Sequence, residues 1–167
     1  MARAVSQPHL SAVAPVRIDP ELWRRLAVAE DRESFCDSWL KVHAGLLPGV
    51  QHGLVLDLDE GCDEYVVAAV WPDDDTPRPD LVEAAGEAAG DRQPLIMHAA
   101  GDATGTGQDD VILAYPLTVD GTVRTVAVFE LQSPSQSTLH DAMNRVQWGS
   151  AWLEVMYLRR RARIGES

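Results

Sequence analysis

The segment VILAYPLTVDGTVRTVAVFEL, residues 111–131, decides the fold of this chain. Two runs rich in β-branched and aromatic residues, which are typical of strands, flank the dipeptide Asp120-Gly121. Asp-Gly suits a tight turn whose residues take positive φ, so the segment predicts a β-hairpin. Strands joined by so short a connection run antiparallel, and the sheet around this hairpin is therefore predicted to be mostly antiparallel.

Three further β-rich runs precede the hairpin. Residues 52–59 and 64–71 are separated by the turn-forming residues EGCD and predict a second hairpin, while residues 93–98 predict a short strand. The segment 99–110 is rich in Gly, Thr and Asp and is expected to form a loop that lies over the sheet. Together these runs predict a sheet of five or six strands.

Two helices are predicted before the first strand. Asp19 and Pro20 are a favourable start for a helix over residues 21–30. The carboxylate of Asp19 can cap the helix, and the missing N–H of Pro20 costs no hydrogen bond because the first N–H groups of a helix have no partner within it. A second helix is predicted from about Asp31 to Pro48, with its apolar residues on one face. Those residues are Phe35, Trp39, Leu40, His43 and Leu46.

Two helices are also predicted among and after the strands. Asp80 is expected to cap an alanine- and glycine-rich helix over residues 81–90, which Gly90 would end. The last helix is predicted from about Gln136 to Arg163. The resulting order of elements predicts an α+β fold in which the N- and C-terminal helices pack on one face of the antiparallel sheet.

The last helix carries two apolar stripes. Leu139, Met143, Val146, Ser150 and Leu153 are spaced to lie on the sheet. Trp148, Trp152 and Val155 form a second stripe beside them. Because a surface helix normally buries a single stripe, the second needs another partner, either the helix over 31–48 or the same helix of a second chain. We expect the second arrangement, a parallel homodimer with both tryptophans at the junction.

Composition limits the classes of function. The chain has 167 residues and a formal net charge of −12, and an acidic surface repels phosphates, so we expect no nucleic-acid partner. Cys36 and Cys62 are not spaced as metal ligands are, so we expect neither a metal nor a cofactor. A chain of this size with two cysteines is typical of a reduced, intracellular protein. The expected organisation is a flexible arm over 1–18, one domain over 19–163 and a tail over 164–167.

Several segments of the sequence resemble GAF domains, which are sensor domains related in fold to PAS domains. The segments are FCDSWLKVHAGLLPGVQHGLVL, AAVWPD, AYPLTVDGTVRTVAVFEL and VQWGSAWLEVMYLRRR, and the resemblance covers roughly residues 31–161. They look most like the GAF domain that precedes the membrane span in bacterial membrane-fusion adaptors of HlyD type. This resemblance implies a non-enzymatic sensory or regulatory domain of an efflux or secretion system, at the cytoplasmic face of the inner membrane.

The resemblance also implies sites. The arginines that end the last helix would lie near the membrane, where positive charge meets anionic lipid; they are Arg159, Arg160, Arg161 and Arg163. A small-molecule pocket is expected between the sheet and the helix and loops that follow the second strand. Its candidate lining residues are Tyr65, Val67, Trp71, Leu95, Met97, His98, Leu113 and Tyr115. A filled core at this place would instead favour a pure dimerisation or assembly module that has no ligand.

Other chemistry is disfavoured by the sequence. DLDEGCDEY lacks the glycine and glutamate of a calcium loop, and GDATGTGQDD lacks the lysine and the helix of a phosphate loop. Free methionine sulfoxide reductase shares the GAF fold but depends on paired cysteines around its pocket, and neither Cys36 nor Cys62 is expected there. No catalytic residues are therefore assigned.

Overall fold

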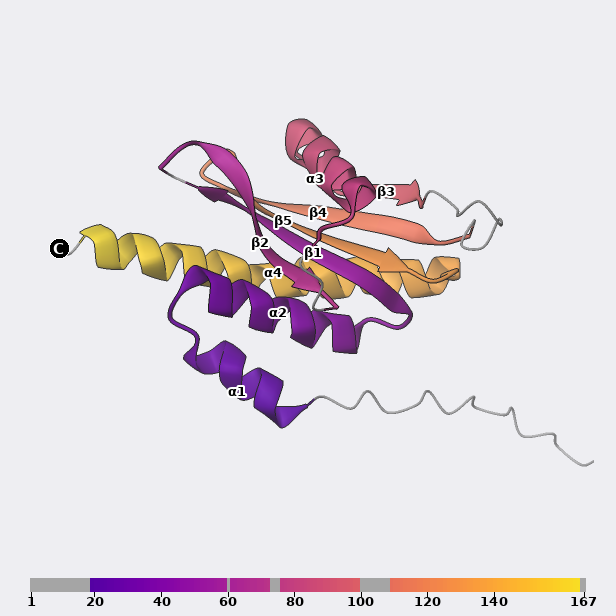
Figure 1. Cartoon of the computed structure of the whole chain (residues 1–167), viewed down its shortest axis with the longest axis horizontal. Helices are drawn as coiled ribbons and strands as arrows, with labels where there is room; N and C mark the ends of the chain where they lie inside the picture. Colours follow the sequence, from indigo (N-terminus) through magenta and orange to yellow (C-terminus); the bar gives the residue numbers. More distant parts are fainter. Residues whose placement is uncertain (1–18, 60, 73–75, 100–108, 166–167) are drawn as a thin grey trace, which may run out of the picture.

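A five-stranded antiparallel sheet, in the order β2-β1-β5-β4-β3, forms the middle layer of the molecule (Figure 1). The computed structural model describes residues 19–59, 61–72, 76–99 and 109–165. Its elements are α1 (Pro20–Val28), α2 (Arg32–Leu46), β1 (Val50–Asp59), β2 (Glu64–Trp71), α3 (Pro79–Asp91), β3 (Leu95–His98), β4 (Val111–Val119), β5 (Thr122–Leu131) and α4 (Gln136–Gly165). The predicted α+β class and the order of its elements are confirmed, with five strands in the sheet.

The β4–β5 hairpin has the predicted tight turn. Asp120 and Gly121 both take positive φ, at 52° and 78°, as the Asp-Gly pair requires. The two strands stay paired from Val119 and Thr122 at the turn to Val111 and Leu131 at the open end. β5 also pairs with β1, so the hairpin occupies the centre of the sheet, where both of its faces must be covered.

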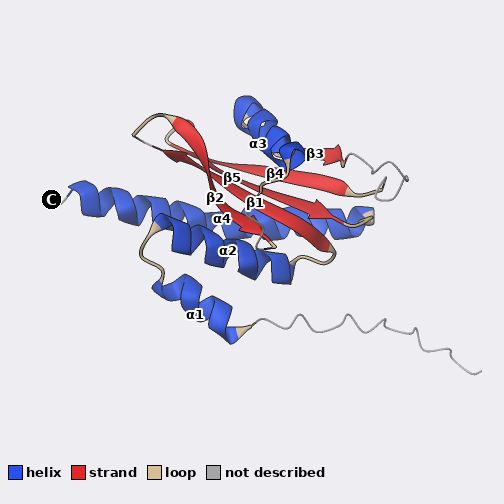
Figure 2. Cartoon of the chain, in the orientation of Figure 1, coloured by secondary structure: helices blue, strands red, loops and turns tan. Residues whose placement is uncertain are grey.

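The helices cover both faces of the sheet. The helices α2 and α4 lie on one face, with α1 packed outside α2, and α3 lies on the other (Figure 2). The side chains of β4 alternate accordingly: Leu113 and Leu117 belong to the core beneath α2 and α4, whereas Ile112 and Ala114 belong to the core beneath α3. The N- and C-terminal helices thus share one face, as predicted.

The helices α2 and α4 pack against each other at Gly149. The ring of Trp39, which is fully buried, donates a hydrogen bond from Nε1 to the carbonyl oxygen of Gly149 at 2.8 Å. His43 stacks on Trp39 with its ring centroid 4.0 Å away, and a Cβ on residue 149 would lie 2.0 Å from His43 Nε2. Only glycine therefore fits at this crossing.

His43 is held in one neutral tautomer. Its Nδ1 lies 2.8 Å from the carbonyl oxygen of Trp39, and since a carbonyl only accepts, Nδ1 carries the proton and Nε2 does not. The side chain is 3% exposed, and burial lowers the pKa of His43 from 6.5 to about 4. The folded state consequently resists protonation of this residue.

The helix α3 differs slightly from its prediction. It begins at Pro79, so Asp80 lies in the first turn and accepts from the backbone N–H of Leu81 at 3.0 Å, while Arg78 occupies the cap position. It ends at Asp91 rather than at Gly90, because Arg92 takes the left-handed conformation. The expected arm 1–18, residues 60 and 73–75, most of the loop over 99–110 and the last two residues lie outside the described residues.

The crossing of α2 and α4 yields a prediction for Gly149→Ala. The new methyl group would overlap His43. Since overpacking of a core typically destabilises by this amount, we expect the free energy of unfolding to fall by roughly 1–3 kcal/mol. Urea denaturation measures this change. Gly86→Ala is the matched control, because nothing lies within 4 Å of a Cβ at this exposed position of α3, and it should stabilise by roughly 0.5–1 kcal/mol. Equal effects of the two substitutions would contradict the proposed close contact.

Burial of neutral His43 predicts a pH dependence of stability. Between pH 6.5 and about 4 the unfolded chain binds a proton at this residue that the folded chain does not, so the free energy of unfolding falls as the pH falls through this window. At 1.36 kcal/mol for each pKa unit, the loss approaches about 3 kcal/mol. Urea denaturation of wild type and His43→Gln at several pH values isolates this contribution. In the variant, the free energy of unfolding should change less steeply with pH than in the wild type. Identical slopes would show that His43 is not the source of the pH dependence.

Candidate functional site

The eight residues predicted to line a pocket do not lie around one cavity. Leu95 and Met97 pack in the core beneath α3, whereas Trp71, Leu113 and Tyr115 pack on the opposite face, in the core beneath α2 and α4. Tyr65 and Val67 are exposed on the edge strand β2, and His98 is exposed on the edge strand β3. The register of the sheet, which the sequence does not reveal, separates the set.

The space between α3 and the sheet is filled where the structure describes it. Leu81, Ala84, Ala85 and Ala88 of α3 are at most 2% exposed and pack directly on the strands. A cavity near the start of α3, beside Trp71, has a volume of about 10 Å³, which is barely enough for one water molecule. The small side chains that the sequence shows in this helix thus bring it close to the sheet.

A polar cluster stands at the N-terminal end of α3. Arg78 donates hydrogen bonds to Glu130, whose side chain is 5% exposed, and to Asp80, with Arg78 Nε 3.1 Å from Asp80 Oδ1. Arg78 Nη1 also lies 2.9 Å from His52 Nδ1. Since a guanidinium only donates, His52 accepts through Nδ1 and is neutral in this arrangement. The 3.7 Å approach of His52 Nδ1 to Glu130 Oε2 is therefore not an ion pair.

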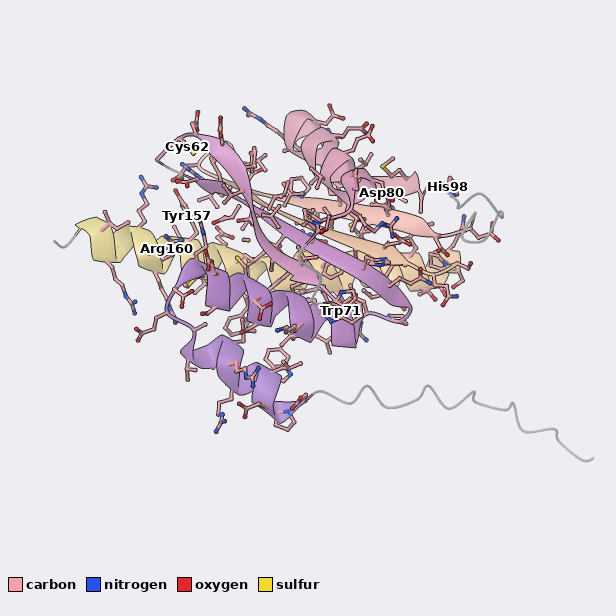
Figure 3. The ribbon with its side chains drawn as sticks, viewed as in Figure 1. Cys62, Trp71, Asp80, His98, Tyr157 and Arg160 are labelled. Carbon is pink, nitrogen blue, oxygen red and sulfur yellow. The ribbon has the colours of Figure 1, made fainter. Side chains whose placement is uncertain are left out.

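The two cysteines lie in different surroundings, one buried and one exposed. Cys36 is buried, and burial raises the pKa of its thiol to about 12, so it is protonated at neutral pH. Cys62 is exposed in the β1–β2 turn (Figure 3). Among residues 19–59, 61–72, 76–99 and 109–165, no three His, Cys, Asp or Glu side chains are grouped so as to hold a metal ion.

The second apolar stripe of α4 is exposed. Trp148 is 80% exposed, Trp152 54% and Val155 41%, so this stripe does not pack on α2, which contacts α4 through Gly149 instead. Trp152 and Val155 line an apolar groove of about 240 Å³ whose other wall includes Trp23 and Leu26 of α1. The stripe and this groove, which we call the α1–α4 groove, form one apolar surface along α4.

The arginines at the end of α4 separate into two groups. Arg160 and Arg161 line a cleft of about 430 Å³ between α4 and the end of the β1–β2 hairpin, and Arg161 also pairs with Asp120 at 2.6 Å. Arg159 lies at the α1–α4 groove. Figure 3 shows Arg160 and Tyr157 on α4 below the hairpin turn that carries Cys62. We call this space the arginine cleft, and the sequence offered no motif for it.

Three solved structures place this architecture among known folds. The chain resembles a putative GAF sensor protein from Burkholderia vietnamiensis, with a TM-score of 0.61 at 16% identity over 86% of this chain and 88% of that one. The GAF domain of A. aeolicus nlh2 in an inactive state gives a TM-score of 0.60 at 19% identity over 84% and 93%. Free methionine-R-sulfoxide reductase from Neisseria meningitidis, solved with its substrate, gives a TM-score of 0.60 at 17% identity over 86% of this chain and 88% of that one.

The protein therefore has the GAF fold. A scan against protein-family models found no match, and a search of curated proteins found none either. Because these structural neighbours include both a sensor and an enzyme, the shared fold does not by itself choose a function. No helix within the described part of the chain is long and apolar enough to cross a bilayer.

Proposed function

We propose that this chain is a non-catalytic regulatory GAF domain that works as a homodimer through α4. The observation that carries the proposal is the apolar surface of α4, on which Trp148 is 80% exposed. Exposed tryptophans beside an apolar groove are typical of protein interfaces, where they are frequent anchors. The filled space beneath α3 supports assembly more than ligand sensing at that place.

The position of Trp148 beside the α1–α4 groove supports a twofold dimer. Trp148 protrudes from α4 one turn before Trp152, and Trp152 lines the α1–α4 groove. One copy thus offers a protruding indole and a neighbouring groove on the same side. A twofold axis reuses the same patch on both subunits, so each Trp148 would enter the groove of the other copy.

The resemblance to adaptors supports a location for this dimer. In such proteins a GAF domain precedes a membrane span, so we place the module at the cytoplasmic face of the inner membrane of an efflux or secretion system. The exposed side chains of Arg159 and Arg163, near the end of α4, would then face anionic lipid. Sedimentation with phosphatidylglycerol vesicles, which should carry down the wild type and less of the Arg159→Gln/Arg163→Gln variant, tests this location.

The lack of catalysis is proposed from the state of the cysteines. Cys36 is buried with a raised pKa, and Cys62 is an exposed turn residue. We therefore expect no turnover of free methionine-R-sulfoxide, in an assay that follows oxidation of a supplied thiol reductant. Turnover by the wild type that disappears in Cys62→Ser would contradict a non-catalytic domain.

The dimer is tested by light scattering after size-exclusion chromatography. We expect the wild type to elute as a dimer and Trp148→Ala/Trp152→Ala to elute as a monomer, because each anchoring tryptophan typically contributes 2 kcal/mol or more. Val67→Ala/Ile96→Ala is the matched control, since these exposed apolar residues lie on the edge strands β2 and β3. It should remain dimeric, and a wild type that is monomeric at millimolar concentration would end the proposal.

The polar cluster at α3 supports a second candidate, small-molecule sensing. Arg78, His52 and Glu130 supply donors and acceptors beside the small cavity near Trp71, and pockets commonly combine apolar walls with a few such groups. A ligand here would have to move α3 away from the sheet. This candidate keeps the predicted location of the pocket but replaces most of its lining residues.

Thermal shift with a library of small metabolites tests the second candidate. A compound that binds only the folded state at 100 times its Kd stabilises by about 2.7 kcal/mol, which raises the melting temperature measurably. We expect any such shift to disappear in Arg78→Gln and to persist in Arg24→Gln, whose exposed side chain pairs with Glu21 on α1. The absence of any shift at millimolar concentrations would leave assembly as the function.

A further inference from the structure

The arginine cleft brings four cationic side chains together in an otherwise acidic chain. It is lined by residues of α2, the β1–β2 hairpin, β5 and the last turns of α4. Four arginines and three aspartates line it, although the chain as a whole carries 26 acidic and 14 basic residues. They are Arg32, Arg124, Arg160, Arg161, Asp57, Asp59 and Asp63. Its volume of about 430 Å³ lies within the range of small-molecule sites.

Two of the three aspartates already accept hydrogen bonds or ion pairs from the protein. Asp57 Oδ1 accepts from Thr125 Oγ1 at 2.9 Å, and its Oδ2 lies 3.5 Å from Arg32 Nε. Asp59 Oδ1 accepts from the backbone N–H of Gly61 at 2.9 Å. These carboxylates are partly neutralised, so they oppose an incoming anion less than their number suggests. Asp63, in the hairpin turn, stands at the exposed end of the cleft.

Two of the guanidinium groups come from different elements, β5 and α4. Arg124 is half-buried on β5, with its Cζ 5.1 Å above the centroid of the Tyr157 ring, which fixes the position of its cation. Arg160 lies one turn beyond Tyr157 on α4 and is exposed at the same cleft (Figure 3). Guanidinium groups bind oxyanions through paired N–H donors, and phosphate and carboxylate are their usual partners.

We propose that the arginine cleft binds a small molecule that carries a phosphate or carboxylate group together with an amino group. The oxyanion contacts Arg124 and Arg160, and the amino group contacts Asp63. This arrangement uses both signs of charge that line the cleft. The site lies outside the space beneath α3 and involves neither the tryptophan stripe nor the α1–α4 groove.

Binding here would tie the end of α4 to the sheet. The last buried residue of α4 within the described chain is Leu153, and beyond it only Met156 and Tyr157 are partly buried before the helix ends at Gly165. An oxyanion held between Arg160 on α4 and Arg124 on β5 adds a contact across this weakly packed part. The ligand would therefore order the last turns of α4, residues 154–165.

Isothermal titration calorimetry with two probes tests the site. O-phosphoserine carries both the oxyanion and the amino group, whereas inorganic pyrophosphate carries the oxyanion alone. We expect both to bind to the wild type at millimolar concentration or below, and Arg124→Gln and Arg160→Gln each to weaken both at least tenfold. Arg24→Gln, on exposed α1, is the matched control and should bind like the wild type. No binding of either probe at 10 mM would overturn the proposal.

Asp63→Asn distinguishes the two parts of the ligand. Asp63 has a φ of 58°, which asparagine adopts equally well, so the substitution removes charge without straining the turn. We expect the substitution to weaken the binding of O-phosphoserine, because the amino group of this probe loses its carboxylate partner. It should strengthen the binding of pyrophosphate, because a charge that repels this anion is removed. Equal effects on both probes would contradict the assigned orientation.

Hydrogen exchange and vesicles complete the test. O-phosphoserine should slow exchange at the amides of residues 154–165 in the wild type and leave them unchanged in Arg160→Gln. Binding of the protein to phosphatidylglycerol vesicles that is lost in Arg160→Gln, with no calorimetric signal for the free probes, would assign Arg160 to lipid and overturn the small-molecule site. Retained circular dichroism of each variant shows that loss of binding is not loss of folding.

Discussion

The contact of Trp39 and His43 with Gly149 is the constraint on which the arrangement of helices depends. It sets how closely α2 and α4 approach each other on the sheet. The close approach is possible because Gly149 of α4 has no side chain. With Gly149 turned toward α2, its neighbour Trp148 must point away from the core, and Trp152 follows one turn later. Close packing inside the domain and the apolar surface outside it are thus two results of the same helix rotation.

The two faces of the sheet are closed in different ways. Beneath α2 and α4, large side chains such as Trp39 and Phe129 fill the core, with ring centroids 6.1 Å apart. Beneath α3, alanines let the helix lie against the strands with little space between them. This explains why the proposed function turns on the helices rather than on a central pocket.

The sequence predicted the fold better than the site. Asp120-Gly121 and the alternation around it specify a hairpin locally, and capping residues such as Asp19 and Asp31 specify helix starts, so these elements followed from short-range chemistry. The pocket residues depended on which face each strand presents, and that depends on register between strands distant in sequence. Leu113 and Leu95 were grouped together, yet they lie on opposite faces. The arginine cleft was missed because its walls come from four elements that no motif connects.

The pairing of Arg161 with Asp120 has a mechanical consequence. Asp120 sits at the tip of the central hairpin, and Arg161 lies near the end of α4. From Gly149 at the crossing of α2 and α4, the 16 residues to Gly165 extend for roughly 24 Å at 1.5 Å per residue. A tilt of about 5° at the crossing would move the end of this segment by about 2 Å. Such a tilt would have to stretch or break the contact between Arg161 and Asp120, so this exposed ion pair couples the angle of α4 to the tip of the central hairpin.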